Sequence, residues 1–172
     1  MTPQSHVQSQ KSNGWIVLLL LAIAGFGAVG LTYFRARGNS VEVVAAIDSL
    51  AVLPFVNVAG NAETEQVSED ITNNLINTLS QFRDLRVAPR TAVSAYKGQP
   101  IDLQRVPREL NVRALLVGTV DLRGDKLLVE TELIDASAHS AIWRARYDRN
   151  LSDLVGIRSD IVRQISAKLR IE

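Results

Sequence analysis

The stretch RALLVGTVDLRGDKLLVETELID, from Arg113 to Asp135, constrains the fold more tightly than any other part of the chain. Its Gly124-Asp125 step stands between two apolar runs and predicts a two-residue hairpin turn, in which glycine accepts a positive φ. Because side chains alternate across strands, the turn also fixes the register. The pairs predicted to face each other on one side of the sheet are Leu122 with Leu127, Val120 with Val129, Gly118 with Thr131, and Leu116 with Leu133.

A third strand, SAIWRARYD, is predicted after a turn around Ala136 to His139. In the register that we expect, the missing side chain of Gly118 makes room for the Trp143 indole. The pairs of that register are Glu130 with Arg144, Trp143 with Thr131, and Tyr147 with Leu127.

The other face of this sheet is predicted to carry charges, because Glu130 and Glu132 then meet Arg144 and Arg146. Two carboxylates about 7 Å apart on one face have the spacing of a catalytic pair. Opposite two arginines on an exposed sheet, they instead indicate a solvated ion-pair ladder, worth a fraction of a kcal/mol per pair.

The segment Ser49 to Phe82, SLAVLPFVNVAGNAETEQVSEDITNNLINTLSQF, predicts a buried strand, a loop and an amphipathic helix. The strand spans Leu50 to Val56, with Pro54 bending its end, and the loop spans Val58 to Val67. This loop contains neither G-x-x-x-x-G-K-[ST] nor G-x-G-x-x-G, so we expect it only to connect the two elements. The helix is indicated by Ile71, Leu75, Leu79 and Phe82, with Ser68, Glu69 and Asp70 as its cap and negative first turn.

Further elements complete a predicted order of β-α-β-α-β-β-β-α. Leu85 to Pro89 predicts a second strand, parallel to the first. Asp102 to Leu110 predicts a helix that begins or kinks near Pro107. The fold class is therefore α/β with a mixed sheet. A last helix is indicated by Leu154, Ile157, Ile161, Ile165 and Leu169, with Ser152 or Asp153 as its cap.

Residues Trp15 to Phe34, WIVLLLLAIAGFGAVGLTYF, form an uncharged run long enough to cross a bilayer as one transmembrane helix. A cleaved signal peptide is the alternative, because Ala22-Ile23-Ala24 and Ala28-Val29-Gly30 match the small-x-small pattern of cleavage sites. The apolar run continues past both sites, which favours an uncleaved anchor. Around it we expect a disordered tail over 1–14, a linker over 35–48 and an α/β domain over 49–170.

The flanks of this run carry few charges. Lys11 precedes it, whereas Arg35 and Arg37 follow it. The positive-inside rule taken alone therefore leans toward a cytoplasmic folded domain.

Composition excludes several kinds of site. The chain has 172 residues, a net charge of +1 and no cysteine, which excludes disulfides and thiolate chemistry and provides no strong field for nucleic acid. His6 and His139 lack metal-ligand partners at useful spacing, and no serine lies in G-x-S-x-G. Arg86, Arg90 and Lys97 are too few to form a nucleic-acid surface. We expect no catalytic residue, no metal and no cofactor.

Several segments together resemble a known family. They are the AVLPF of the first strand, the Leu-x-Val-x-x-Arg-Thr step that ends at Arg90-Thr91, the Tyr-Lys-Gly of Tyr96 to Gly98, and the W-x-x-x-Y-D of Trp143 to Asp148. Residues 49–169 resemble the TolB N-terminal-like domain, which occurs beside the membrane in bacterial kinase, adenylate cyclase and tetratricopeptide proteins. FlgO- and CsgG-type envelope domains are more distant relatives. The resemblance implies a periplasmic, non-catalytic interaction or assembly module, against the lean of the arginine flank.

We therefore expect a single-pass protein of the bacterial inner membrane whose periplasmic domain binds an envelope protein or its own copy. The alternatives are an accessory subunit of a larger membrane complex, or a small-ligand sensor that uses the loop of Val58 to Val67 and the turn of Tyr96 to Gly98. An enzyme built on Glu130 and Glu132 ranks below these. The candidate interaction surface comprises Glu130, Glu132, Arg144, Arg146, Tyr96 and Lys97.

Overall fold

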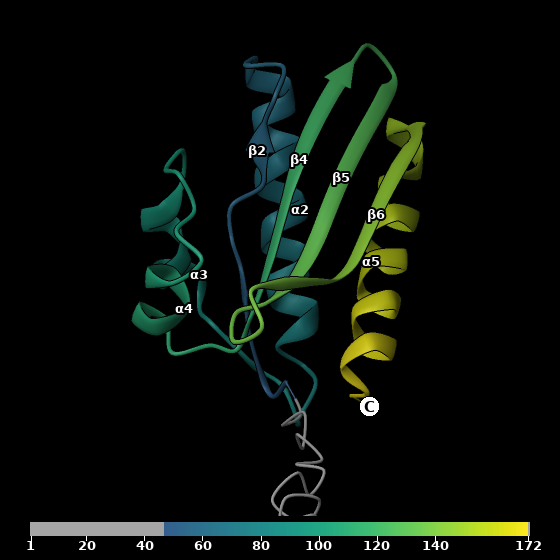
Figure 1. The fold of residues 1–172 in the computed structure, drawn as a ribbon. Coiled ribbons are helices and arrows are strands. Elements are labelled where there is room, and N and C mark those ends of the chain that lie inside the picture. Colours follow the sequence, from purple (N-terminus) through teal and green to yellow (C-terminus); the bar gives the residue numbers. More distant parts are fainter. Residues whose placement is uncertain (1–46, 172) are drawn as a thin grey trace, which may run out of the picture. The chain divides into compact units, whose positions relative to one another are not determined.

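The computed structural model describes residues 47–171, which form a mixed sheet with helices packed against it (Figure 1). The strands are β1 (Ser49–Val52), β2 (Val56–Asn57), β3 (Arg86–Val87), β4 (Ala114–Arg123), β5 (Lys126–Asp135) and β6 (Ser140–Asn150). The helices are α2 (Ala62–Leu79), α3 (Arg90–Val93), α4 (Arg105–Glu109) and α5 (Leu154–Leu169), with 3-10 turns at Ser94–Tyr96 and Leu151–Asp153.

The expected tail, transmembrane helix and most of the expected linker lie outside the described residues. Within residues 47–171, no helix combines the length and the apolar character needed to span a bilayer.

The strands follow the order β3-β1-β4-β5-β6 across the sheet. β1 is parallel to β3 and to β4, whereas β4, β5 and β6 are antiparallel neighbours. The mixed α/β fold and the parallel β-α-β unit are therefore confirmed. The strand predicted over Leu50 to Val56 is in fact two strands, β1 and β2, which both pair with β4. Pro54 lies in the break between them, where its missing N–H cannot continue a ladder.

Helices α2 and α5 cover one face of the sheet (Figure 1). The apolar stripes predicted for both helices are buried there: Ile71, Leu75, Leu79, Ile157, Ile161 and Ile165 have no exposed surface. Phe82 follows the end of α2 and is partly buried against the same core. Asp153 occupies the N-cap position of α5 but makes no capping side-chain hydrogen bond, and Ser152 lies in the preceding 3-10 turn.

The β4–β5 hairpin has the predicted turn and register. Gly124 has a φ of +57°, and every facing pair that the turn predicts, from Leu122 with Leu127 to Leu116 with Leu133, is present. Strands β4 and β5 are each 10 residues long, so this hairpin forms the central part of the sheet.

The predicted register of β6 is wrong by two residues. Glu130 pairs with Arg146 rather than Arg144, and Trp143 pairs with Leu133. The turn over Ala136–His139 has four residues, and a bulge lies between Leu133 and Ile134. Each of these shifts β6 by one residue relative to the predicted pairing. A shift of two keeps every side chain on its expected face, which is why the inward and outward faces are still correct.

The space at Gly118 is filled by Phe55, not by Trp143. A Cβ atom built on Gly118 would collide with the Phe55 ring and would lie 2.6 Å from the Glu130 carbonyl oxygen. Phe55 is 4 % exposed, because it inserts from the break between β1 and β2 into the face that α2 covers.

Helix α2 begins well before the predicted start, within the segment that we expected to be a loop. The side chain of Asn61, not Ser68, caps it by accepting a hydrogen bond from the Thr64 N–H at 2.7 Å. Ser68 is buried inside the helix, where its hydroxyl donates to the Thr64 carbonyl at 2.9 Å. The buried side of the first helical turns of α2 carries small polar residues, whose side chains form hydrogen bonds with the helix backbone. The apolar periodicity therefore does not indicate this part of the helix.

The segment between β3 and β4 is only partly as predicted. The helix expected over Asp102 to Leu110 is confined to Arg105–Glu109, with Pro107 in its first turn, where no N–H partner is required. The Asp102 carboxylate accepts hydrogen bonds from the Gln104 and Arg105 N–H groups ahead of it. Helix α3 was not predicted, because its four residues are too few to show a period.

Asp135 organises the β5–β6 turn and predicts an acid-sensitive contribution to stability. Burial acts to raise the pKa of Asp135, but hydrogen bonds from the Ser137 hydroxyl and the Ser137 and Ala138 N–H groups, together with the Arg113 charge, outweigh it and lower the pKa. Because the pKa of Asp135 is lower in the folded than in the unfolded chain, its ionised carboxylate stabilises the fold at pH values above the unfolded pKa of about 3.9. This stabilisation is lost as the pH falls toward the folded-state pKa. We expect Asp135→Asn, which keeps an acceptor oxygen, to flatten the dependence of unfolding free energy on pH between about 5 and 3.

The measurement is urea unfolding across that pH range, with Asp125→Asn in the exposed β4–β5 turn as the matched control. An acid limb that is equally steep in Asp135→Asn and in the unsubstituted protein would contradict the assignment.

Candidate functional site

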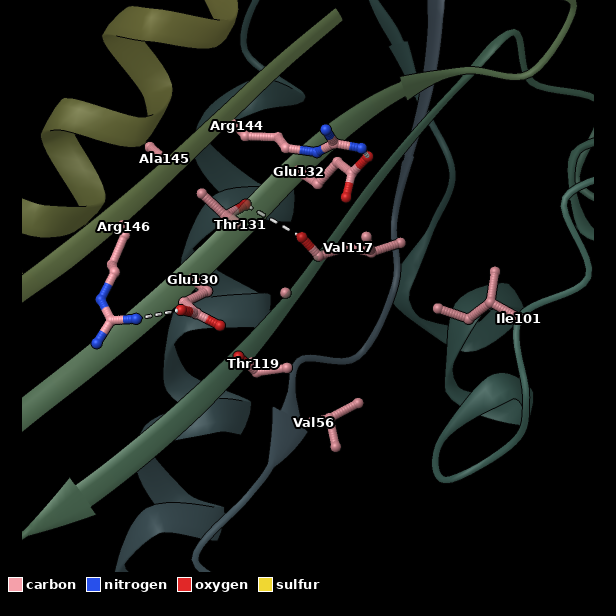
Figure 2. A pocket seen from close by; sticks show the side chains of 11 residues that line it. Val56, Ile101, Val117, Thr119, Glu130, Thr131, Glu132, Arg144, Ala145 and Arg146 are labelled. Carbon is pink, nitrogen blue, oxygen red and sulfur yellow. Dashed lines mark hydrogen bonds and ion pairs between the residues drawn. The ribbon is translucent and has the colours of Figure 1, made fainter. Parts of the chain in front are cut away.

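The face of the sheet opposite α2 and α5 carries a groove with a volume of about 600 Å³ (Figure 2). It crosses β4, β5 and β6 and is bordered by β2 and by the segment before α4. The groove is lined by Val56, Ile101, Val117, Gly118, Thr119, Glu130, Thr131, Glu132, Arg144, Ala145 and Arg146. Its volume lies in the range of sites that bind small molecules or short peptide segments.

One side of this groove is apolar. Val56 and Ile101 are 49 % and 38 % exposed, respectively, and are therefore among the few large apolar side chains left open to solvent in the described part of the chain. Val117 and Thr119 form the floor between them and the charged side, as Figure 2 shows. The Thr131 hydroxyl donates to the Val117 carbonyl at 3.1 Å and ties β5 to β4 beneath the floor.

The other side of the groove is a ladder of two ion pairs. Arg144 donates to Glu132 at 2.7 Å and Arg146 donates to Glu130 at 2.9 Å (Figure 2). The hydrogen bond to Glu132 raises the pKa of Arg144. The predicted charged face is therefore present, with the partners exchanged by the two-residue register shift. Glu130, Arg144 and Arg146 are exposed and Glu132 is half-buried, so each pair is open to solvent and contributes only a fraction of a kcal/mol to stability.

The remaining predicted surface residues, Tyr96 and Lys97, do not line this groove. The Lys97 ammonium lies 2.5 Å from Glu65 and 2.6 Å from Glu69, both on α2. Hydrogen bonds to these two carboxylates raise the pKa of Lys97, and the bond from Lys97 lowers the pKa of Glu65. The Tyr96 hydroxyl donates a hydrogen bond to Glu109 at 2.6 Å, and this bond raises the pKa of Tyr96.

The contact of Lys97 with Glu65 joins the two segments that the sensor hypothesis invoked, Val58 to Val67 and the Tyr96 to Gly98 turn, although the first of them is helical from Ala62. The hollow beside them measures about 90 Å³, below the usual range for a small-molecule pocket. Lys97 and the α2 carboxylates already neutralise one another there. The larger groove on the sheet is therefore the better candidate site.

Sequence reasoning missed the apolar half of the groove. Val117 and Thr119 could have been found, because they alternate with Leu116, Gly118 and Val120 along β4 and must point to the opposite face. Ile101 gave no signal, since it stands in an irregular segment that only the tertiary fold carries to the sheet.

Both carboxylates of the groove are engaged by arginine side chains. Each accepts one charge-assisted hydrogen bond, Glu132 from Arg144 and Glu130 from Arg146. Among residues 47–171, no group of three or more His, Cys, Asp or Glu side chains is arranged to hold a metal ion.

The fold belongs to the TolB-like class of mixed α/β domains. It matches TolB from Acinetobacter baumannii with a TM-score of 0.52 at 12 % identity, over 72 % of this chain and 28 % of that one. It matches lipoprotein GNA1162 from Neisseria meningitidis with a TM-score of 0.51 at 19 % identity, over 69 % of this chain and 96 % of that one. The TolB-like fold that the sequence resemblance implied is therefore confirmed.

The family model that matches residues 46–165 is described as the second domain of HilA/YgeH-like transcriptional regulators, and the chain belongs to this family. A putative adenylate cyclase 3 from Rhizobium meliloti is 36 % identical over 124 residues, which are 72 % of this chain. The chain spans about a fifth (21 %) of the length of that relative. The shared part therefore corresponds to one domain of a much longer protein.

Proposed function

We propose that this protein is a membrane-anchored, non-catalytic interaction module whose sheet groove binds a segment of a partner protein. The observation that carries the proposal is the groove itself, with exposed Val56 and Ile101 facing a ladder of paired charges across an apolar floor. An apolar strip beside hydrogen-bonding groups is the usual composition of a protein contact surface. The site residues are Glu130, Glu132, Arg144 and Arg146, with Tyr96 and Lys97 as a separate surface.

The proposed organisation follows from the sequence. Trp15 to Phe34 serves as a single transmembrane anchor in the bacterial inner membrane, residues 35–48 as a linker, and residues 49–170 as the folded domain on the periplasmic side. The likeness of the fold to TolB and to a lipoprotein supports an envelope setting. The family membership and the cyclase relative support a role as the interaction domain of a signalling or regulatory system.

A photocrosslinking amino acid in the groove tests this proposal. Placed at Thr119 in the membrane-inserted chain, it should yield one adduct of defined mass, because Thr119 lies on the groove floor. The control position is Val155 on α5, which is 64 % exposed and does not line the groove. Equal adducts from both positions, or none from either, would count against the groove.

Charge variants make the test specific to the ladder. Glu132→Arg places two cations side by side and should abolish the adduct, whereas Glu132→Arg with Arg144→Glu restores an ion pair and should recover it. An adduct of twice the chain mass identifies a second copy as the partner. A ligand sensor would instead be favoured by two results together. No adduct would form, and a small ligand would raise the melting temperature of the unsubstituted chain but not of the chain with the photocrosslinking amino acid at Thr119.

A fusion of alkaline phosphatase after Glu172 tests the orientation separately. Phosphatase activity is expected, and its absence together with fluorescence of a cytoplasmic reporter at the same position would place the domain in the cytoplasm.

A further inference from the structure

A second hollow, of about 620 Å³, lies where β1, β3 and β4 begin. These three strands are parallel, so their first residues meet at one end of the sheet. Arginine side chains from distant parts of the sequence converge there with a histidine, and we call this hollow the basic pocket. Its basic side chains are Arg86 at the start of β3, Arg108 in α4 and Arg113 before β4, and His139 of the β5–β6 turn lines it beside them.

The pocket has more cationic than anionic groups facing it. Asp48 is the acidic side chain among its lining residues, and one of its oxygens accepts a hydrogen bond from Ser49 at 2.9 Å. The guanidinium of Arg86 donates to the Asn111 carbonyl, which neutralises no charge. The Arg108 carbonyl accepts a hydrogen bond from the Asn111 N–H, and the Arg108 guanidinium lies near enough to the Asp102 carboxylate to interact with its charge. An anion that enters the pocket would therefore meet three lining arginines against one lining carboxylate, and the hydrogen bond of Arg86 goes to a neutral carbonyl oxygen.

The place of the pocket in the chain identifies the anion. Asp48 and Ser49 line it and directly follow the linker, so any anchor before residue 35 is tethered to this end of the sheet. Residues 35–48 would reach at most about 50 Å if fully extended. The proposed anchor would therefore attach to the pocket end of the sheet, whereas the Gly124 hairpin lies about 30 Å from that end along β4 and β5.

We propose that the basic pocket binds the phosphate headgroups of anionic phospholipids and so docks this end of the domain on the membrane surface. The proposal rests on the anchor proposed above for the location of the membrane, but not on the partner of the sheet groove. Negative lipid surfaces attract clustered arginines within a Debye length, and a guanidinium pairs with phosphate in a fixed geometry. Lipid binding by this pocket would fix the orientation of the groove-bearing sheet face relative to the bilayer.

The test uses the full chain with vesicles of phosphatidylcholine, alone or with about 30 % phosphatidylglycerol. Because the chain has no cysteine, Ser137→Cys gives a single labelling position beside the pocket. Nitroxide-headgroup lipids quench a fluorophore there when the pocket lies on the surface. We expect quenching to increase about threefold with phosphatidylglycerol and to disappear near 1 M salt, where the Debye length is about 3 Å.

The variant Arg86→Gln with Arg108→Gln should lose the phosphatidylglycerol-dependent quenching. The matched control is Arg123→Gln with Lys126→Gln, which removes the same charge at the far end of β4 and β5 and should retain it. Equal quenching in both lipid mixtures, or an equal loss in both variants, would overturn the proposal. Displacement by inorganic phosphate at constant ionic strength would show a free-phosphate site and would also overturn it.

Flotation separates a failure of the anchor from a failure of the pocket. An anchored chain floats with phosphatidylcholine vesicles whatever its pocket residues. If the chain instead floats only with phosphatidylglycerol vesicles and the Arg86→Gln, Arg108→Gln variant does not, the anchor is wrong and the pocket stands. If the chain floats with both kinds of vesicle and the quenching does not depend on lipid charge, the anchor is supported and lipid binding by the basic pocket is ruled out.

Discussion

Gly118→Ala is expected to lower the free energy of unfolding by about 3 kcal/mol, because the added methyl group has no space. Its Cβ would collide with the Phe55 ring and lie 2.6 Å from the Glu130 carbonyl oxygen. The carbonyl belongs to the β4–β5 ladder and cannot retreat without breaking strand pairing. Urea unfolding followed by circular dichroism measures the loss.

The matched control is Gly156→Ala in α5. A Cβ atom there meets only the end of the Arg149 side chain at 3.7 Å, which is an ordinary contact. Alanine is the better helix former by roughly 0.5–1 kcal/mol, so this variant should be slightly more stable. Two glycine substitutions of the same size are thus predicted to have opposite signs.

A second substitution shows which neighbour causes the strain. Phe55→Leu removes the ring atoms that the new methyl group meets but leaves the Glu130 carbonyl in place. The double variant Phe55→Leu, Gly118→Ala should therefore be less destabilised than the sum of the two single variants. Simple additivity would show that Phe55 and Gly118 do not share this space.

The parts of the fold that the sequence predicted are those set by local rules. The Gly124-Asp125 turn has only one pairing that keeps the apolar residues of both strands inward, so the whole β4–β5 register followed from it. The predicted register of β6 failed because neither the length of the β5–β6 turn nor the bulge between Leu133 and Ile134 is evident from the side-chain alternation.

The candidate site shows the same division. The charged ladder was predicted, because its residues alternate with the buried ones along β5 and β6. The apolar wall was not, because Val56 and Ile101 come from a two-residue strand and an irregular segment. The basic pocket was not predicted for the same reason: Arg86, Arg108 and His139 come from β3, α4 and the β5–β6 turn, which only the tertiary fold brings together.

The break between β1 and β2 depends on one hydroxyl, and Thr72→Val is expected to cost about 2 kcal/mol. The Phe55 N–H cannot reach a strand there and donates instead to Thr72 Oγ1 at 3.1 Å, in a buried position. The same hydroxyl donates to the Ser68 carbonyl at 2.8 Å. Valine keeps the shape of threonine but leaves the Phe55 N–H buried without an acceptor.

Thr72→Ser separates the hydroxyl from the methyl group. Serine retains the acceptor for Phe55 and loses only one buried methyl group, so a cost of about 1 kcal/mol is expected. Hydrogen exchange at the Phe55 amide gives the local readout: exchange should accelerate in Thr72→Val and remain slow in Thr72→Ser. If the two variants exchange alike, the strand break is held by packing of the Phe55 ring against Gly118 rather than by α2. Phe55 would then position β2, and with it the Val56 wall of the groove, through its side chain alone.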